Sequence, residues 1–217
     1  MKSVAVLGKG GLALHACEVV SGVDGWTLSA VVPNDVEPDW DVCLSVEAPR
    51  RWPRARLVRS GDWRELVGEG HDLVVSVLYN RIIGRELIEG SGRVINCHPG
   101  RLPEYRGVRP ANWSLVNGES CHGVTIHEVD EGVDTGPVIA QVVFPIWPHV
   151  DEVRDVWQRS MAYGRQLLRD TLPRIDALHG IPQDSARART YRSSQDERLG
   201  DRRGWHRHHT GPDWPRT

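Results

Sequence analysis

The first twenty residues contain the pattern that most limits the fold of this chain. An apolar run at residues 3–7 ends in Gly8-Lys9-Gly10-Gly11, and residues 12–20 then show helical spacing. A strand, a glycine-rich turn and a helix in this order open a doubly wound sheet. Further apolar runs at residues 72–78 and 93–97 have the composition of buried strands. The sequence therefore predicts an α/β fold, a Rossmann-like, doubly wound and mainly parallel sheet with helices on both faces.

The glycine-rich turn itself has two interpretations. Backbone N–H groups at a helix N-terminus can hold a phosphate, and a tight turn can equally serve only to pack the helix on the sheet. The turn matches neither G-x-G-x-x-G nor a P-loop. We therefore predict no nicotinamide cofactor and leave the phosphate interpretation open.

Apolar periodicity and turn residues place the remaining elements. Further strands are expected at residues 26–32, 42–46, 122–129 and 135–144. Helices are expected at residues 62–67, 85–89, 110–117 and 151–178, the last of them kinked at Pro173. The Pro-, Arg- and Trp-rich stretch 38–56 is expected to be irregular.

The apolar periodicity is lost towards the end of the chain. We predict a folded domain over residues 1–181 and a C-terminal extension over residues 182–217, which is irregular or wraps over the domain. In the second case Tyr191, Trp205 and Trp214 are the expected anchors.

Composition and charge limit the partners and the compartment. The formal net charge is −2, so no overall basic field indicates nucleic acid. No apolar run approaches membrane-spanning length, and the apolar run at the start is too short for a signal peptide. The four cysteines form no C-x-x-C pair, which favours reduced thiols. We expect a cytoplasmic protein without a nucleic-acid or membrane partner.

Three polar groups have the character of a reaction centre. Asn96 and His98 alternate at the end of a strand that Pro99-Gly100 breaks, so both side chains share one face at its carboxyl end. Asp134 follows in a glycine-rich turn. An amide can stabilise an oxyanion, an imidazole can move protons, and a carboxylate can support the charged imidazole. Because no serine or cysteine in the pattern is an obvious nucleophile, we expect direct attack by an amine, without an acyl-enzyme.

Each of these residues also has a structural interpretation. Asn96 could satisfy the backbone of a turn, His98 could donate to a carbonyl group, and Asp134 could cap a turn. His127 could face a cleft or pack within its strand, and His122 lies in the same strand. The joint occurrence of the three polar groups favours a functional site. Three histidines in the tail could bind a metal adventitiously or lie in solvent, and no metal site is predicted from them: His206, His208 and His209.

Two motifs around these residues carry a resemblance to a known family. The first reads N-x-H-P-G-R-L-P-E-Y-R-G from Asn96, and the second reads G-V-T-I-H-x-x-D-E-G-x-D-T-G from Gly123. Together they resemble the formyltransferase domain that uses 10-formyltetrahydrofolate. The resemblance implies that Asn96, His98 and Asp134 are catalytic, that residues 1–181 form the catalytic domain, and that 10-formyltetrahydrofolate is the co-substrate, with no metal. It also implies that Asn96 and protonated His98 stabilise the oxyanion.

The resemblance assigns expected roles to further residues. The family binds the folate pterin ring largely through the backbone of a segment that corresponds here to Asn80, Arg81, Ile82 and Ile83. Without the family, the same segment is equally a plain strand-to-helix connection. The turn residues Asp130, Glu131 and Gly132 are expected to contact the same co-substrate. Acceptor binding is expected from Tyr105, Arg106 and Arg109, although these arginines could also lie in solvent.

The acceptor is the open part of the prediction. Family members that act on glycinamide ribonucleotide have Gly-Asn-Gly-Ser-Asn where this chain has Gly8 to Leu12, which disfavours that substrate. Methionyl-tRNA enzymes carry a substantial C-terminal domain, and only about 35 residues follow residue 181 here. We favour N-formylation of a nucleotide-linked amino sugar. The alternatives are another metabolite amine, such as an amino acid, hydroxyornithine or glycinamide ribonucleotide, and a catalytically silent folate-binding protein. A homodimer is left open, and removal of residues 193–217 is expected to leave a folded, folate-binding domain.

Overall fold

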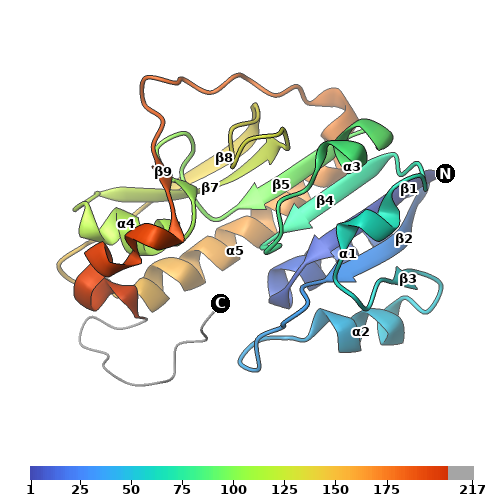
Figure 1. Ribbon diagram of the computed structural model, residues 1–217, viewed down its shortest axis with the longest axis horizontal. Helices are drawn as coiled ribbons and strands as arrows, with labels where there is room; N and C mark the ends of the chain where they lie inside the picture. Colours follow the sequence, from blue (N-terminus) through green and yellow to red (C-terminus); the bar gives the residue numbers. More distant parts are fainter. Residues whose placement is uncertain (205–217) are drawn as a thin grey trace.

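A seven-stranded sheet forms the centre of the computed structural model, which describes residues 1–204 (Figure 1). The strand order is β3-β2-β1-β4-β5-β7-β8, and the first five strands in this order are parallel. β7 and β8 are antiparallel to their neighbours. The strands are β1 Lys2–Gly8, β2 Trp26–Pro33, β3 Arg56–Leu57, β4 Leu73–Val77, β5 Val94–His98, β7 Cys121–Glu128 and β8 Val138–Pro145. The predicted mainly parallel, doubly wound sheet is confirmed.

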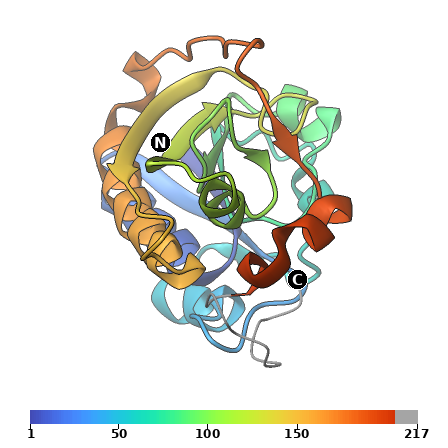
Figure 2. The same ribbon diagram turned by 90° about the vertical axis from the view of Figure 1, so that its left-hand side faces the viewer.

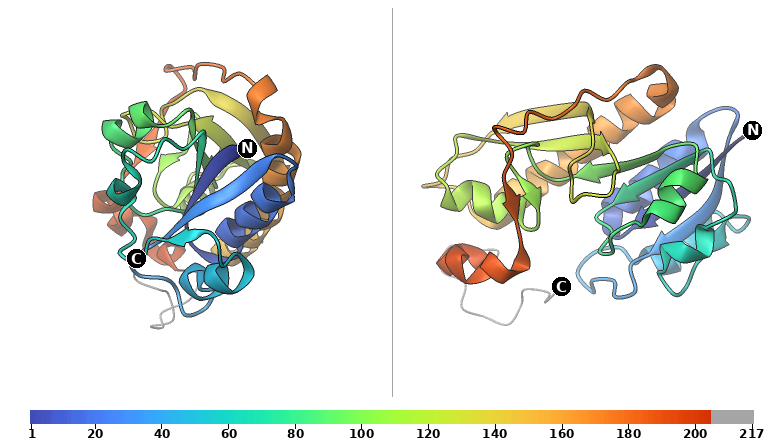
Figure 3. Two further views of the ribbon diagram at one scale, coloured as in Figure 1. Left: turned by 90° about the vertical axis from the view of Figure 1, so that its right-hand side faces the viewer. Right: turned by 45° about the horizontal axis from the view of Figure 1, so that its top comes forward.

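Helices cover both faces of this sheet, because the strands are apolar on both sides (Figure 3). In β1, Val4 and Val6 belong to one buried cluster, while Ala5 and Leu7 belong to the other, as the two-residue period of a strand requires. The helices are α1 Gly10–Gly22, α2 Leu44–Arg51, α3 Arg85–Gly90, α4 Pro110–Val116 and α5 Val153–Thr171, with 3-10 helices η1 Trp63–Leu66, η2 Leu172–Ala177 and η3 Ser193–Arg203.

The prediction of a strand at residues 42–46 is wrong, and so is that of irregular structure throughout residues 38–56. Helix α2 begins at Leu44 instead. The carboxylate of Glu37 accepts hydrogen bonds from the backbone N–H groups of Leu44 and Ser45, at 2.5 and 2.9 Å, and so satisfies the first turn of the helix. Leu44 and Ala48, four residues apart, are both buried, so the segment has a helical rather than a strand period.

Two of the expected helices differ from the prediction. In place of a helix over residues 62–67 there is only the 3-10 turn η1, which Asp62 caps by accepting from the N–H of Arg64 at 3.0 Å. The long helix ends at Thr171, and the chain continues in η2 with non-helical backbone at Arg174. The predicted single helix with a kink at Pro173 is therefore an α-helix that ends two residues before Pro173, followed by a 3-10 helix with its kink at Arg174.

The chain after residue 181 runs back over the body of the protein (Figures 1 and 2). Its strand β9, Thr190–Tyr191, pairs in parallel with β6, Arg106–Gly107, and η3 packs near α4. The Tyr191 ring stacks on Tyr105 and Trp113, with centroid distances of 5.5 and 4.7 Å, and Leu199 is only 2% exposed in the same cluster. Among the described residues, no helix combines the length and apolarity that a membrane span requires. The five tail residues Trp205, His206, His208, His209 and Trp214 lie outside the described residues.

Candidate functional site

Strand β5 carries two of the predicted polar groups to its carboxyl end. Asn96 is half-buried and His98 is 5% exposed. Gly100, just beyond the strand, must lack a side chain, because a Cβ there would lie 2.4 Å from His98 Nε2. The antiparallel register places His127 of β7 directly opposite Asn96. The sheet therefore brings an amide and two imidazoles together.

Asp134 lies at the centre of this group. Its Oδ2 is 3.4 Å from His98 Nδ1, and its Oδ1 is 3.4 Å from His127 Nε2 and accepts a hydrogen bond from Asn96 Nδ2 at 3.3 Å. The backbone N–H of Gly107 donates to Oδ2 at 2.8 Å. Residues 38 apart along the chain thus meet in one cluster. Contacts of 3.3–3.4 Å are typical of catalytic groups in free enzymes, which shorten once substrate is bound.

The protonation of His98 follows from its two partners. Its Nε2 lies 2.6 Å from the carbonyl oxygen of Tyr105, which can only accept, so Nε2 carries hydrogen. The other nitrogen, Nδ1, faces the Asp134 carboxylate. Burial is the largest influence on the His98 pKa and lowers it below the ordinary value, while the charge of Asp134 acts in the opposite direction. The imidazolium therefore depends on Asp134 for its stability in this buried place.

Asp134 remains ionised at neutral pH. Burial by itself would raise its pKa, but the neighbouring imidazoles of His98 and His127 and the N–H of Gly107 outweigh burial. The net pKa lies well below the usual range of an aspartate. A permanent negative charge is thus held between two imidazoles, which is the electrostatic arrangement that a proton-transfer site needs.

His127 is a member of the cluster that the sequence left undecided. Its Nδ1 donates to the carbonyl oxygen of Glu128 at 2.6 Å, and its Nε2 lies 3.2 Å from the Asn96 amide nitrogen and 3.4 Å from Asp134 Oδ1. Strand alternation made the cleft-facing orientation one of two options, and the pairing register of β5 with β7 decides it. His122 of the same strand is fully buried and donates from Nε2 to the carbonyl oxygen of Pro99 at 3.0 Å, so it packs within the fold.

The segment predicted to bind the pterin ring has a free backbone. Among the described residues, the peptide groups of residues 80–83 make no backbone hydrogen bond. The side chains of Asn80 and Arg81 are held by Asp35, at 2.8 and 3.2 Å, and Ile82 is 72% exposed. Peptide groups without backbone partners beside an exposed apolar side chain suit a flat, hydrogen-bonding heterocycle. Ile83 is buried and belongs to the core.

The turn at residues 130–132 is organised by its own side chains. Asp130 Oδ1 accepts from the N–H of Gly132 at 3.1 Å and from the hydroxyl of Thr135. Glu131 lies 3.7 Å from Arg85 Nε across the end of the sheet. These contacts shape the turn that carries Asp134.

The three residues predicted to bind the acceptor all have partners within the protein. The Tyr105 hydroxyl donates to Glu119 at 2.6 Å, and the residue is 1% exposed. Arg106 bonds Gln183, and Arg109 Nε lies 3.0 Å from Asp196 in the tail. Their role in acceptor binding stays a prediction.

The glycine-rich turn before α1 is occupied by a carboxylate of the chain itself. The N–H of Gly11 donates to Asp41 Oδ1 at 3.0 Å, and a Cβ on Gly10 would lie 2.2 Å from Asp41 Oδ2. Burial lowers the pKa of Lys9 in the same turn, and Asp41 opposes this shift. An aspartate therefore lies where the start of α1 would otherwise attract a phosphate.

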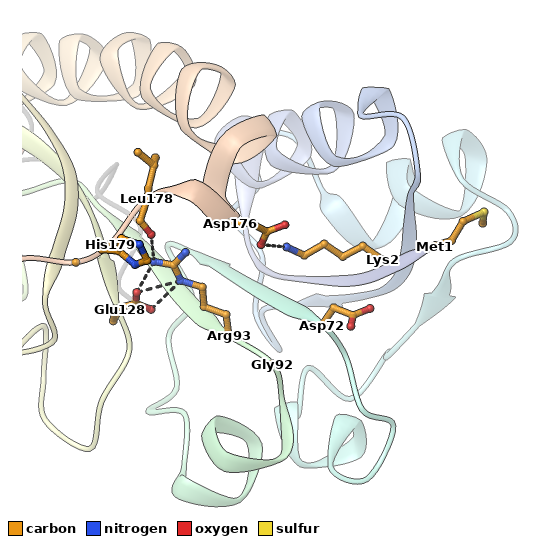
Figure 4. Close-up of a pocket in the computed structure, with 10 residues that line it drawn as sticks. Met1, Lys2, Asp72, Gly92, Arg93, Glu128, Asp176, Leu178 and His179 are labelled. Atoms are coloured by element: carbon orange, nitrogen blue, oxygen red, sulfur yellow. Dashed lines mark hydrogen bonds and ion pairs between the residues drawn. The ribbon is translucent and has the colours of Figure 1, made fainter.

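A pocket of about 880 Å³ lies at the opposite end of the parallel strands (Figure 4). Lys2 and Arg93, which line it, stand at the amino-terminal ends of β1 and β5. Both are paired within the pocket, Lys2 with Asp176 and Arg93 with Glu128. The pocket is therefore separate from the cluster around Asp134.

A family model described as "Formyl transferase" matches residues 41–172. The methionyl-tRNA formyltransferase of Streptococcus thermophilus is 30% identical over 151 residues, which make up 69% of this chain and 48% of that protein. The chain thus spans about half the length of the curated relatives it matches.

Solved structures share the fold. The N-formyltransferase from Helicobacter canadensis, in complex with folinic acid and dTDP-3-aminofucose, has a TM-score of 0.79 and 25% identity, covering 89% of this chain and 72% of that one. Glycinamide ribonucleotide transformylase 1 from Symbiobacterium toebii has a TM-score of 0.67 and 22% identity, covering 83% of this chain and 94% of that one. The second likeness is one of fold alone.

Proposed function

Because the chain belongs to the formyl transferase family, we propose that it transfers a formyl group from 10-formyltetrahydrofolate to a primary amine of a small molecule. The observation that carries this proposal is the cluster at the carboxyl end of β5. There Asp134 lies within 3.4 Å of the His98 imidazole and accepts the Asn96 amide at 3.3 Å. An amide donor, an imidazole and an ionised carboxylate are the groups that direct acyl transfer to an amine needs.

The chemistry assigns one task to each side chain. The acceptor nitrogen forms a bond to the formyl carbon, and the carbonyl oxygen becomes an oxyanion. Asn96, half-buried at the strand end, donates to that oxygen together with the His98 imidazolium. The bond from carbon to the folate nitrogen then breaks, and His98 supplies the proton that this nitrogen takes up. Asp134 stabilises the imidazolium and orients a water molecule, which carries the proton that the amine loses to the solvent.

The lowered pKa of His98 suits this task. A buried imidazolium gives up its proton more readily than an exposed one, so it is a better acid towards the departing folate nitrogen. Such an imidazolium forms only beside a stable negative charge, which Asp134 provides. We propose that the pterin ring of the co-substrate binds to the free backbone of residues 80–83. We also propose that the co-substrate contacts the turn at residues 130–132.

We propose a nucleotide-linked amino sugar as the acceptor. The Helicobacter canadensis relative, which was solved with dTDP-3-aminofucose, supports this choice. Asp41 at the start of α1 weighs against glycinamide ribonucleotide, because its carboxylate would repel a phosphate at that turn. The tail after residue 181 is built into the protein through Tyr191 and Leu199, so we propose no role for it in holding RNA. The four cysteines are free thiols, in keeping with a cytoplasmic enzyme.

An acceptor panel tests the proposal. Purified protein is incubated with 10-formyltetrahydrofolate alone and then with 10-formyltetrahydrofolate plus one amine at a time. The amines are nucleotide-linked amino sugars, glycinamide ribonucleotide, hydroxyornithine and free amino acids. Tetrahydrofolate release is followed optically, and the acceptor mass is measured. We expect one added formyl group on an amino sugar. Formylation of glycinamide ribonucleotide alone would overturn the proposal of an amino sugar as acceptor. Folate binding without turnover on any amine would favour a silent binding protein, and turnover without an amine would indicate a hydrolase.

A further inference from the structure

Gln183 lies beyond the predicted domain boundary, yet its side chain reaches the turn that carries Asp134. Its Nε2 donates to the carbonyl oxygen of Asp134 at 2.9 Å and to that of Gly136 at 2.7 Å. Its Oε1 accepts from Nε and Nη2 of Arg106, at 3.0 and 2.8 Å. Two hydrogens and two lone pairs are all that a glutamine amide offers, and each is used here.

These bonds close a ring around Asp134. Gln183 holds the backbone carbonyl of Asp134 and binds Arg106, and the next residue, Gly107, donates its N–H to the Asp134 carboxylate at 2.8 Å. The backbone end and the carboxylate end of Asp134 are thus fixed by one connected unit. The tail supports that unit a second time, because the N–H of Arg106 donates to the carbonyl oxygen of Arg189 at 3.0 Å.

The Asp134 backbone needs such support. Its φ is +53°, in the left-handed region that residues other than glycine seldom adopt, although aspartate tolerates it better than most. Its carboxylate lies 3.4 Å from His98 Nδ1 and 3.4 Å from His127 Nε2, so a small displacement of the turn would lose both imidazoles. The orientation of the carboxylate is therefore set by groups that hold the turn, and Gln183 bonds that turn twice.

We propose that Gln183 is a positioning residue for the Asp134 carboxylate, and that the chain beyond residue 181 thereby completes the active site. This inference rests on the proposed function, in which Asp134 supports the His98 imidazolium. Gln183 itself touches neither substrate nor reacting atoms. It acts by fixing the turn, so its loss slows the chemical step and leaves folate binding in place.

Two substitutions and a matched control test the role. Gln183→Ala removes the whole contact, and Gln183→Glu keeps its size and its attraction to Arg106 but loses both hydrogens to the Asp134 and Gly136 carbonyls. Gln195→Ala is the control, because Gln195 also makes a tail hydrogen bond, to the N–H of Arg192 at 2.8 Å. We expect single-turnover formyl transfer to fall roughly tenfold in both Gln183 variants, with near-normal folate affinity and melting temperature. The Gln195 variant should transfer at the wild-type rate.

The same substitution in an Asp134→Asn background separates positioning from a general structural effect. If Gln183 acts through the Asp134 carboxylate, Gln183→Ala should slow the Asp134→Asn protein far less than the wild type. Equal loss in both backgrounds, no loss in either, or a Gln183 variant that fails to fold would overturn the inference. A wild-type protein that transfers no formyl group would overturn the proposed function as well. Normal dependence on Asp134 with no dependence on Gln183 would overturn this inference alone.

Discussion

Substitution of Asp134 by asparagine removes one charge and leaves nearly the same shape. Asparagine tolerates the left-handed backbone at φ +53° as well as aspartate does, so the turn should keep its conformation. In the wild-type protein the N–H of Gly107 donates to Asp134 Oδ2 at 2.8 Å. The carbonyl oxygen of the asparagine amide can accept the same hydrogen bond. We therefore expect a folded protein with a melting temperature close to that of the wild type.

The expected loss of rate follows from the contact with His98. An opposite charge at such a distance, here 3.4 Å, stabilises a neighbouring ionised group by roughly 1–3 pKa units. Each unit corresponds to roughly 1.4 kcal/mol, or a factor of ten. Since burial already lowers the His98 pKa, removal of the carboxylate lowers it further and depletes the imidazolium. We expect single-turnover transfer to slow by roughly 10²-fold.

Three measurements on Asp134→Asn decide the matter: melting temperature, folate affinity, and single-turnover rate as a function of pH. Folate affinity should change little, because residues 80–83, to which we assign the pterin ring, are a separate part of the chain. The rate should recover towards lower pH, where His98 can still be protonated despite its lower pKa. A folded variant with the wild-type rate and pH profile would refute the catalytic role of Asp134. Loss of folding with normal turnover in the remaining folded protein would make it a turn residue.

Three further predictions concern stability and the shape of the site. His122 is fully buried and its pKa is lowered from 6.5 to about 3, so protons favour the unfolded chain between these values. Stability should be complete above pH 6.5 and fall by roughly 5 kcal/mol as the pH drops to about 3, and His122→Gln should flatten this slope in urea titrations. Leu199→Ala should cost roughly 2–5 kcal/mol of unfolding free energy, because the side chain is 2% exposed. Deletion of residues 193–217 removes the same side chain and should therefore lower the melting temperature. Gly100→Ala should abolish transfer in a folded protein, since its Cβ would lie 2.4 Å from His98 Nε2 and displace the imidazole; a normal rate would show that this ring position is unimportant.

The sequence predicted the parts of the site that lie on regular structure. Asn96 and His98 alternate on a strand that a Pro-Gly pair ends, and a strand has only two faces. Their shared position was therefore readable from spacing. Asp134 was readable only together with the surrounding motifs, because nothing local distinguishes it from a turn residue.

The predictions that failed depend on contacts that the apolar period of the sequence does not show. Residues 42–46 have strand composition, but the helix at Leu44 is fixed by the carboxylate of Glu37, which no periodicity reveals. His127 was undecided because its place opposite Asn96 depends on strand register. Gln183 was missed altogether, since a single glutamine in a polar tail has no pattern. Its role follows only from where the tail returns.

The proposed reaction is direct transfer from the folate to an amine without an acyl-enzyme. It is tested by a rapid-quench single turnover with 10-formyltetrahydrofolate labelled at the formyl carbon, with a nucleotide-linked amino sugar as acceptor. The cluster of Asn96, His98 and Asp134 holds an amide, an imidazole and a carboxylate, so the label should pass to the amine as fast as tetrahydrofolate appears. No label should remain on the protein, and His98→Ala should stop both processes together. Label on the protein before it reaches the acceptor, or labelled formate released at the same rate without an amine, would rule out direct transfer.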